Sequence, residues 1–227
     1  MKPKAVRQLK VLYLRAGIAR RAEFASCLLA LTTEFGKSSA FHFSIDLKFQ
    51  EVDLFVNGNA DAPLPLTAQA ALLDGLPSTD VVLMTLPAET FARAPFINAE
   101  GPKPLRDTFS PRGFLNLSPA QRRTVEAANT VIDFGVKLLA KAQELDFIAL
   151  MAFPEDLGAA RLGVPASVWQ RRDVRDLQRM GFFRAAFRQD VWAQVDGARP
   201  TGVLTNAPSL QEEADIFMGW PSFDGQN

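Results

Sequence analysis

The chain has 227 residues, enough for one large domain with a buried core. Hydrophobic residues make up 48% and charged residues 22%, which excludes a disordered or fibrous chain. With 25 basic and 25 acidic residues there is no net charge to draw the whole protein to nucleic acid. The single cysteine, Cys27, and the single histidine, His42, exclude an internal disulfide and a conventional zinc site, so we expect no metal.

The sequence has no apolar run of about 18 residues and no secretory leader pattern. We therefore expect a soluble, intracellular protein without a membrane span. Nuclear, cytoplasmic and organellar locations all stay open, because the basic start of the chain is too short to decide among them.

Short apolar runs alternate with longer amphipathic ones, a pattern typical of βαβ units around a parallel sheet. Strands are expected at 11–14, 41–45 (ending at Asp46), 52–56 (a weak signal), 81–84, 147–151, 183–192 and 202–206, the last two as an antiparallel pair. Helices are expected around 24–31 and at 66–76, 119–144 and 167–180. The sequence predicts a single domain over 1–210, followed by an irregular tail over 211–227.

Two features mark the segment before the longest predicted helix. Residues 92–118 are rich in Pro and Gly, which indicates a long irregular loop, and such loops inside a compact domain are usually functional. Ser118 and Pro119 then fit the N-cap and first position of a helix.

Candidate binding residues follow the first two predicted strands. In an open parallel sheet, ligands bind beyond the carboxyl ends of the strands. Ala16 and Gly17 form a small-residue turn after the first strand, and Asp46 follows the second, where a carboxylate can accept hydrogen bonds from ribose hydroxyls. Each signal is weak alone, because many such turns contain glycine and Asp often caps a strand end.

Six segments carry a family resemblance through their order and spacing. They are Arg15-Ala16-Gly17, Pro87 to Ala94, Pro104-Leu105-Arg106, Ala152 to Gly158, Ser167-Val168-Trp169 and Arg199-Pro200-Thr201. Over roughly residues 11–210 the chain resembles the DNA cytosine-C5 methyltransferases, and more closely a compact methyltransferase-like family of viral, retroelement and protist genomes.

The resemblance implies a fold and a cofactor. The implied fold is α/β, a Rossmann-like S-adenosylmethionine methyltransferase fold with a mostly parallel seven-stranded sheet, an antiparallel last strand and helices on both faces. S-adenosylmethionine is the implied cofactor, either retained or lost. The positions implied to contact it are Ala16, Gly17, Asp46 and Pro87.

Departures from the family pattern affect the chemistry. Family members attack the base with a Cys at the position of Ala88 and support the attack with a Glu at the position of Ala152. Both halves of the covalent mechanism are therefore missing. Glu89 and Arg93 remain as residual candidates in the loop that would face the target base. After Gly158 the chain is too short for the family's target-recognition segment, which makes base flipping by this protein alone doubtful.

Several arginines are candidates for contacting nucleic acid. Arg93 and Arg106 would face a base or its phosphates, or would form salt bridges with Asp107 or Glu100. A second candidate group lies on the predicted helix at 167–180 and shares one face. It comprises Arg172, Arg175 and Arg179, with Asp173 and Asp176 interleaved. This face is interpreted either as a self-paired, solvated surface or as a phosphate-contacting stripe.

The sequence leaves three functions open. The first is a degenerate, inactive methyltransferase-like protein that acts as a binding or assembly subunit, with nucleic acid as a candidate partner. The second is an active S-adenosylmethionine-dependent methyltransferase that uses a mechanism without cysteine on nucleic acid. The third is a structural protein that kept only the fold.

Overall fold

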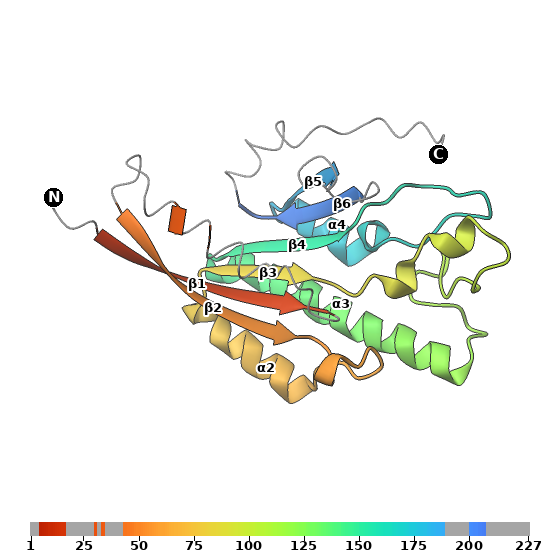
Figure 1. Ribbon diagram of the computed structural model, residues 1–227, viewed down its shortest axis with the longest axis horizontal. Coiled ribbons are helices and arrows are strands. Elements are labelled where there is room, and N and C mark those ends of the chain that lie inside the picture. Colours follow the sequence, from red (N-terminus) through yellow and green to blue (C-terminus); the bar gives the residue numbers. More distant parts are fainter. Residues whose placement is uncertain (1–4, 17–29, 31–32, 35–42, 189–199, 208–227) are drawn as a thin grey trace.

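A computed structural model of the chain describes residues 5–16, 30, 33–34, 43–188 and 200–207. These residues form one mixed sheet in the order β2-β1-β3-β4-β6-β5 (Figure 1). Its strands are β1 (Ala5–Arg15), β2 (Phe43–Asp53), β3 (Val81–Thr85), β4 (Ile148–Pro154), β5 (Phe183–Arg188) and β6 (Pro200–Thr205). The described part of the chain therefore has six strands and not the seven expected.

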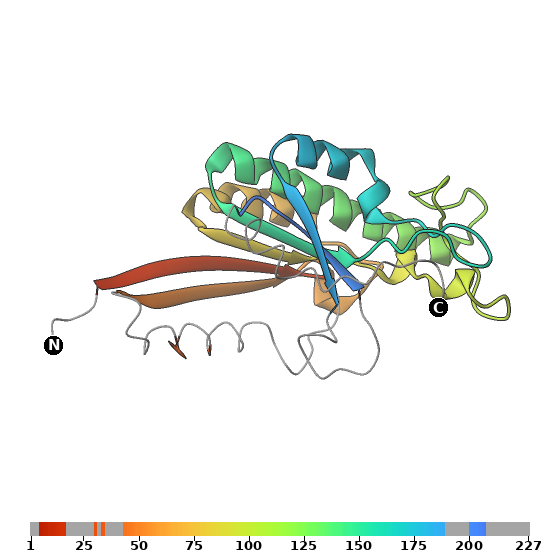
Figure 2. The ribbon, with the colours of Figure 1, turned by 90° about the horizontal axis from the view of Figure 1, so that it is seen from above.

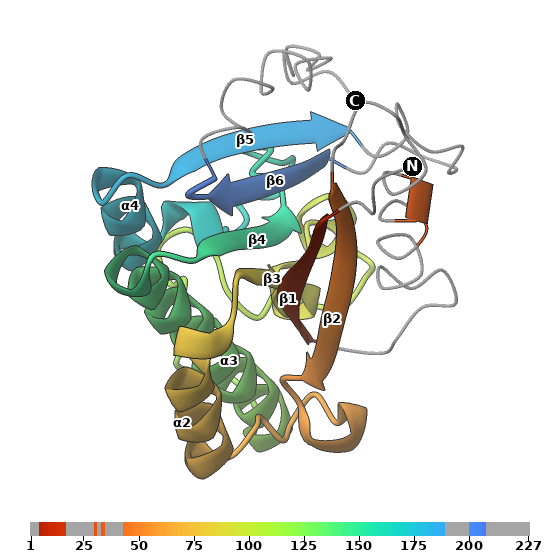
Figure 3. The ribbon, with the colours of Figure 1, turned by 90° about the vertical axis from the view of Figure 1, so that its left-hand side faces the viewer.

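The last strand is reversed, as expected. β1 pairs in parallel with β2 and β3, and β3 pairs in parallel with β4. β6 lies between β4 and β5 and is antiparallel to both. Figure 3, in which the left-hand side of Figure 1 faces the viewer, shows this order across the sheet, with β5 and β6 at one side and β2 at the other.

The expected end of the second strand at Asp46 is wrong, and so is the separate third strand over 52–56. Because β2 stays in register with β1 from Phe43 to Asp53, the two expected strands belong to one long strand, which turns away only after Asp53. A short 3-10 helix, η1 (Val56–Gly58), follows. The polar residues from Asp46 to Gln50 broke the apolar pattern, but strand pairing tolerates them on a half-buried face.

Three α-helices lie along one side of the sheet (Figure 2). They are α2 (Leu66–Gly75), α3 (Pro119–Leu145) and α4 (Arg172–Arg179). The helix expected around 24–31 falls mostly outside the described residues, although Ala30, Thr33 and Glu34 are helical. Gly17 and the tail over 211–227 also lie outside them.

Short 3-10 helices complete the chain path at the ends of the longer elements. They are η2 (Leu76–Ser78), η3 (Glu89–Phe91), η4 (Ala94–Phe96) and η5 (Val168–Gln170). The continuous helix expected at 167–180 is therefore wrong, because Arg171 is extended between η5 and α4. The Arg171 guanidinium is buried there between Asp133 and Asp173, and these ion pairs favour the break.

The core fills the space between α3 and the middle strands. Alternate residues of β3 and β4 are buried on that side, among them Met84 and Met151, and they face Ile132 and Leu138 of α3. Gly135 lets α3 approach closely, since a Cβ there would lie 2.8 Å from the Met84 sulfur. Among the described residues no helix combines the length and apolar character that a membrane span requires.

The start of α3 is fixed by a capping box. The Ser118 hydroxyl accepts a hydrogen bond from the Gln121 N–H, and the Gln121 side chain accepts one from the Ser118 N–H. Pro119 occupies the first helical position, where its missing N–H costs nothing. Both features confirm the helix start predicted from Ser118 and Pro119.

Removing the cap tests this start. Ser118→Ala leaves the Gln121 N–H of α3 without its side-chain partner and is expected to lower the free energy of unfolding by about 1 kcal/mol. Urea denaturation measures the change. Thr130→Ala is the matched control, because it removes a hydroxyl that only bonds back to the Glu126 carbonyl of the same helix. Equal losses in both variants would contradict a capping role for Ser118.

Candidate functional site

The loops that follow β3 and β4 gather at the end of the molecule toward which the parallel strands point (Figure 1). Between these loops lies a hollow of about 270 Å³. It is lined by Ala88, Phe91, Ala92, Arg93, Phe153, Pro154, Glu155, Asp156, Leu157, Pro165, Ala166, Ser167 and Pro200. Its place beyond the carboxyl ends of two neighbouring parallel strands is where open α/β sheets bind ligands.

A row of aromatic rings runs past the hollow, with a guanidinium at each end. Phe91 meets Phe153 edge-on at 5.4 Å between ring centroids, and Phe153 meets Trp169 edge-on at 6.3 Å. Arg106 lies 4.0 Å over the Phe91 ring, and Arg184 lies 4.7 Å over the Trp169 ring. Edge-to-face pairs and cations over ring faces are favourable geometries, so this row fixes two walls of the hollow.

Glu155 brings a buried carboxylate to the hollow. Its side chain is only 6% exposed and forms an ion pair with Arg184. Its second carboxylate oxygen, Oε2, is buried and has no hydrogen-bond partner among the described residues. Burial lowers the pKa of Arg184, which adds to the cost of this pair. A carboxylate kept under these conditions makes Glu155 a candidate functional residue.

The backbone of β6 leaves room for this carboxylate. A Cβ on Gly202 would lie 2.6 Å from Glu155 Oε2 and 2.6 Å from the Trp169 ring. The Trp169 indole also donates a hydrogen bond to the Pro154 carbonyl at 2.8 Å, which holds the ring in place. The reversed last strand therefore shapes the back of the site.

Arg93 joins the two loops. Its guanidinium donates to the Gly158 carbonyl at 2.7 Å and to the Ala159 carbonyl at 2.6 Å. Both terminal nitrogens of Arg93 are thus engaged by the backbone, and no salt bridge with Glu100 or Asp107 forms. Arg93 acts here as a clamp across the hollow and does not present a free cation to a phosphate.

Ala88 and Ala152, the positions at which the resemblance would imply a Cys and a Glu, fall in different places. Ala88 follows β3 and lines the hollow. Ala152 lies within β4, paired with Thr85 and Val203, and does not line it. The buried neighbour Phe153 lines the hollow, and alternate residues of a strand face opposite sides of the sheet. Sequence spacing alone could not fix on which face of β4 each residue lies.

The expected cofactor positions also divide. Ala16 directly follows β1 and Pro87 lies two residues after β3, so both are at the carboxyl edge of the sheet. The Ala16 N–H donates a hydrogen bond to the Thr85 carbonyl at 3.0 Å. Asp46 lies seven residues before the end of β2 and forms a hydrogen bond with Gln8 and an ion pair with Lys48. These two partners lower the pKa of Asp46.

The carboxylate that does stand at the end of β2 is Asp53. Its two oxygens accept from the Arg15 guanidinium at 2.8 Å and from the Phe55 N–H at 3.0 Å. Arg15 also pairs with Glu51. Burial lowers the pKa of Arg15, but these two carboxylates raise it by more. Each oxygen of Asp53 thus already accepts a hydrogen bond, so the ribose contact that the resemblance implies for S-adenosylmethionine would have to share this carboxylate with Arg15 and the Phe55 N–H.

Arg106 has a different role from the one expected. It is only 1% exposed and donates to the Pro111 carbonyl at 2.8 Å and to the Asn129 side chain at 3.0 Å, so it pairs with neither Asp107 nor Glu100. Burial and the nearby charges of other arginines lower its pKa to about 10. Arg106 therefore fixes the loop after β3 from inside and cannot reach a phosphate.

The basic face of α4 is self-paired. Arg172 and Arg179 both form ion pairs with Asp176. Arg175 donates to the Gln170 carbonyl at 2.9 Å. This arrangement agrees with the interpretation of a solvated surface and leaves little support for a phosphate stripe.

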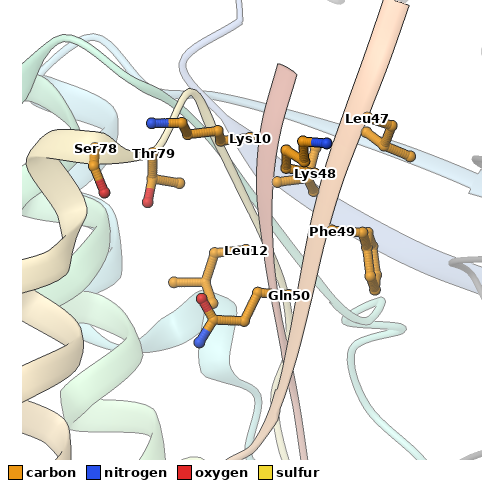
Figure 4. Close-up of a pocket in the computed structure, with 9 residues that line it drawn as sticks. Lys10, Leu12, Leu47, Lys48, Phe49, Gln50, Ser78 and Thr79 are labelled. Atoms are coloured by element: carbon orange, nitrogen blue, oxygen red, sulfur yellow. The ribbon is translucent and has the colours of Figure 1, made fainter. Parts of the chain in front are cut away.

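A larger hollow of about 430 Å³ lies at the opposite end of the sheet, beside β1, β2 and η2 (Figure 4). Lys10 and Lys48 stand opposite each other in the β1–β2 register. Figure 4 shows that the Lys10 side chain reaches toward Ser78 and Thr79, whereas the Lys48 ammonium group points the other way. Because its cations do not converge and it lies away from the carboxyl ends of the strands, this hollow is a poorer candidate.

Glu155 is the site residue that the sequence interpretation missed. It lies within the segment from Ala152 to Gly158 that the sequence analysis singled out, but it was not named as a candidate. No group of three or more His, Cys, Asp or Glu in the described part of the chain is placed to hold a metal ion.

Comparison with protein-family models, curated proteins and solved structures finds no significant match to this chain.

Filling the space at Gly202 tests the wall of the hollow. Gly202→Ala is expected to lower the free energy of unfolding by about 1–3 kcal/mol, because the Trp169 ring or the Glu155 carboxylate must move. Chemical denaturation measures it, with Trp fluorescence reporting the ring environment. Gly75→Ala is the matched control: its new methyl would meet nothing within 4 Å, so no loss is expected. Similar effects in both variants would contradict the close packing at Gly202.

Proposed function

We propose that this protein is a methyltransferase-type α/β domain, similar to the DNA cytosine-C5 methyltransferases, that does not transfer methyl groups. It acts as a binding or assembly subunit, with nucleic acid as its partner. The hollow beyond β3 and β4 is its binding site. It works without S-adenosylmethionine.

The sheet topology supports the fold part of this proposal. A sheet whose only reversed strand is the last one, placed between its two neighbours at one side, is the arrangement that the resemblance implies. The number of described strands is one lower than that fold requires, and the strand that is missing is the weak one over 52–56.

The observation that carries the functional proposal is Ala88. It lines the hollow at the end of β3, where the family places its attacking thiol, and a methyl group cannot form a covalent adduct. The described lining residues include neither Cys nor His. The only acidic residues among them are Glu155 and Asp156, and Glu155 is held by Arg184.

The hollow is suited to binding. Phe91, Phe153 and Ala166 give it apolar walls, and the Ser167 hydroxyl adds a polar group near its edge. Sites of this kind orient a ligand with a few polar groups among apolar ones. The arrangement is already rigid before a ligand arrives, which lowers the entropy cost of binding.

A methyl-transfer assay tests the proposal. Purified protein with tritiated S-adenosylmethionine is expected to incorporate no label into DNA or RNA, because the described residues that line the hollow include no cysteine thiol. An active cytosine-C5 methyltransferase under the same conditions is the positive control. Label that increases with protein concentration would overturn the proposal. Its loss in Glu89→Gln would then indicate direct transfer with Glu89 as the base.

Two further measurements sharpen the result. Calorimetric titration with S-adenosylmethionine is expected to release no heat, because Asp53 is engaged by Arg15 and Asp46 lies far from the strand end. The double variant Ala88→Cys with Ala152→Glu is also expected to stay silent, because Ala152 does not line the hollow. Methyl transfer by the double variant would contradict that placement of Ala152.

A further inference from the structure

Two large apolar side chains project from the loop between β3 and α3. In the segment over residues 104–117, here called the 104–117 loop, Phe109 is 88% exposed and Leu115 is 93% exposed. Single exposed leucines are common on protein surfaces, but two such side chains on one short loop are a reason to look for a partner.

The 104–117 loop is held in place by hydrogen bonds on its buried side. The buried Arg106 donates to the Pro111 carbonyl and to Asn129 of α3, and Asn129 in turn donates to the Arg112 carbonyl at 2.9 Å. The buried guanidinium has no carboxylate partner among the described residues, so its burial costs free energy. Despite this cost Arg106 occupies the position, and the direct effect of its hydrogen bonds is to fix the loop.

Other contacts fix the tip of the loop. One oxygen of Asp107 accepts from the Phe109 N–H at 2.9 Å and from the Ser110 N–H at 2.7 Å. Arg112 forms two parallel hydrogen bonds with Asp133 of α3. Gly113 has a φ of +110°, which other residues rarely adopt. Phe109 and Leu115 are therefore held outward on a backbone that is already ordered.

The sequence around the loop holds more basic than acidic residues, in a chain of zero net charge. Between residues 101 and 123 there is one acidic side chain, Asp107, whose oxygen caps the loop. The same segment holds five basic side chains, namely Lys103, Arg106, Arg112, Arg122 and Arg123. Lys103 and Arg123 are exposed and form no ion pair with another described residue, and Arg122 donates to the Leu115 carbonyl at 2.8 Å.

We propose that the 104–117 loop is an apolar wedge for nucleic acid: Phe109 and Leu115 insert between or stack on bases, while Lys103, Arg122 and Arg123 contact phosphates. Proteins that unstack base steps use apolar side chains of this kind next to basic ones. This inference rests on the proposed function, because it names the partner and the surface by which the subunit holds it.

The size of the apolar surface favours nucleic acid over a protein partner. An aromatic side chain buries about 150–250 Å², whereas a stable protein interface buries about 800 Å² on each partner. Two projecting side chains fall well short of that area. Side chains of this size can stack on or insert between bases, and the exposed Lys103 and Arg123 can contact phosphates.

Binding and unstacking are measured together. The full chain is titrated with single-stranded and duplex DNA that carry a fluorescent adenine analogue, whose emission rises when the base is unstacked. Anisotropy gives the affinity. Phe109→Ala is expected to weaken binding about tenfold, within the range for loss of one stacked base, and to abolish the rise in emission. Leu115→Ala is expected to weaken binding in the same direction.

Matched variants separate the two parts of the surface. Leu66→Ala truncates a side chain that is 77% exposed on α2, and it is expected to bind as the parent protein does. Lys103→Gln with Arg123→Gln is expected to flatten the dependence of affinity on salt while the rise in emission stays. Arg106→Met, which releases the loop but keeps Phe109, is expected to reduce the rise in emission.

Two results would overturn the wedge. One is unchanged affinity and emission in Phe109→Ala and Leu115→Ala, and the other is no binding of either DNA by the parent protein at low salt. Unchanged binding in the two variants would overturn the wedge alone, whereas no DNA binding by the parent protein would also remove nucleic acid as the partner in the proposed function. The inactivity in that proposal is read separately, from methyl transfer. A protein that transfers methyl groups and loses unstacking in Phe109→Ala would keep the wedge and lose the proposal of inactivity.

Discussion

The row from Arg106 through Phe91, Phe153 and Trp169 to Arg184 is the interaction on which the candidate site depends. It begins in the loop after β3, crosses the end of β4 and finishes on β5, so it joins segments that are far apart in the chain. Each ring contacts the next edge-on, and such contacts tolerate little displacement. A displacement of the guanidinium at either end would therefore shift the aromatic side chains that line the hollow.

The guanidinium at each end of this row has a different partner. Arg184 pairs with the buried Glu155, so its charge is balanced inside the site. Arg106 has neutral acceptors as its partners, and burial together with the nearby charges of Arg171 and Arg112 lowers its pKa. One end of the row thus fixes the wall of the hollow, and the other fixes the 104–117 loop. A common support of this kind would keep two binding surfaces in a constant relation.

The sequence predicted the parts of the fold that local rules decide. Ser118 and Pro119 located the start of α3, and the apolar runs located β3, β4 and the antiparallel pair of β5 and β6. It failed at Asp46, because charged residues in an edge strand resemble a strand end until the partner strand is known. It also placed Ala152 at the site, since the face of a strand on which a residue lies depends on the exact register.

The site residues show the same division. Ala88 was named from the family resemblance, and it lies only three residues after the end of β3, where position in the sequence closely limits position in space. Glu155, Arg184 and Gly202 come together from three separate elements, and no local pattern indicates that contact. Arg106 was expected to face a base or its phosphates, or to pair with Asp107 or Glu100. The structure instead buries it against the Pro111 carbonyl and the Asn129 side chain, contacts that no local pattern indicates.

The reversed last strand also affects how the chain must fold. β4 pairs with β6 through contacts such as Met151 with Leu204, which are distant along the chain. During synthesis one edge of β4 stays unpaired until β6 has been made. Pairing of strands that are so distant along the chain is slow. In that interval β4 presents unpaired backbone groups that favour aggregation. Shortening the connection between β5 and β6 would therefore act first on the yield of correctly folded protein.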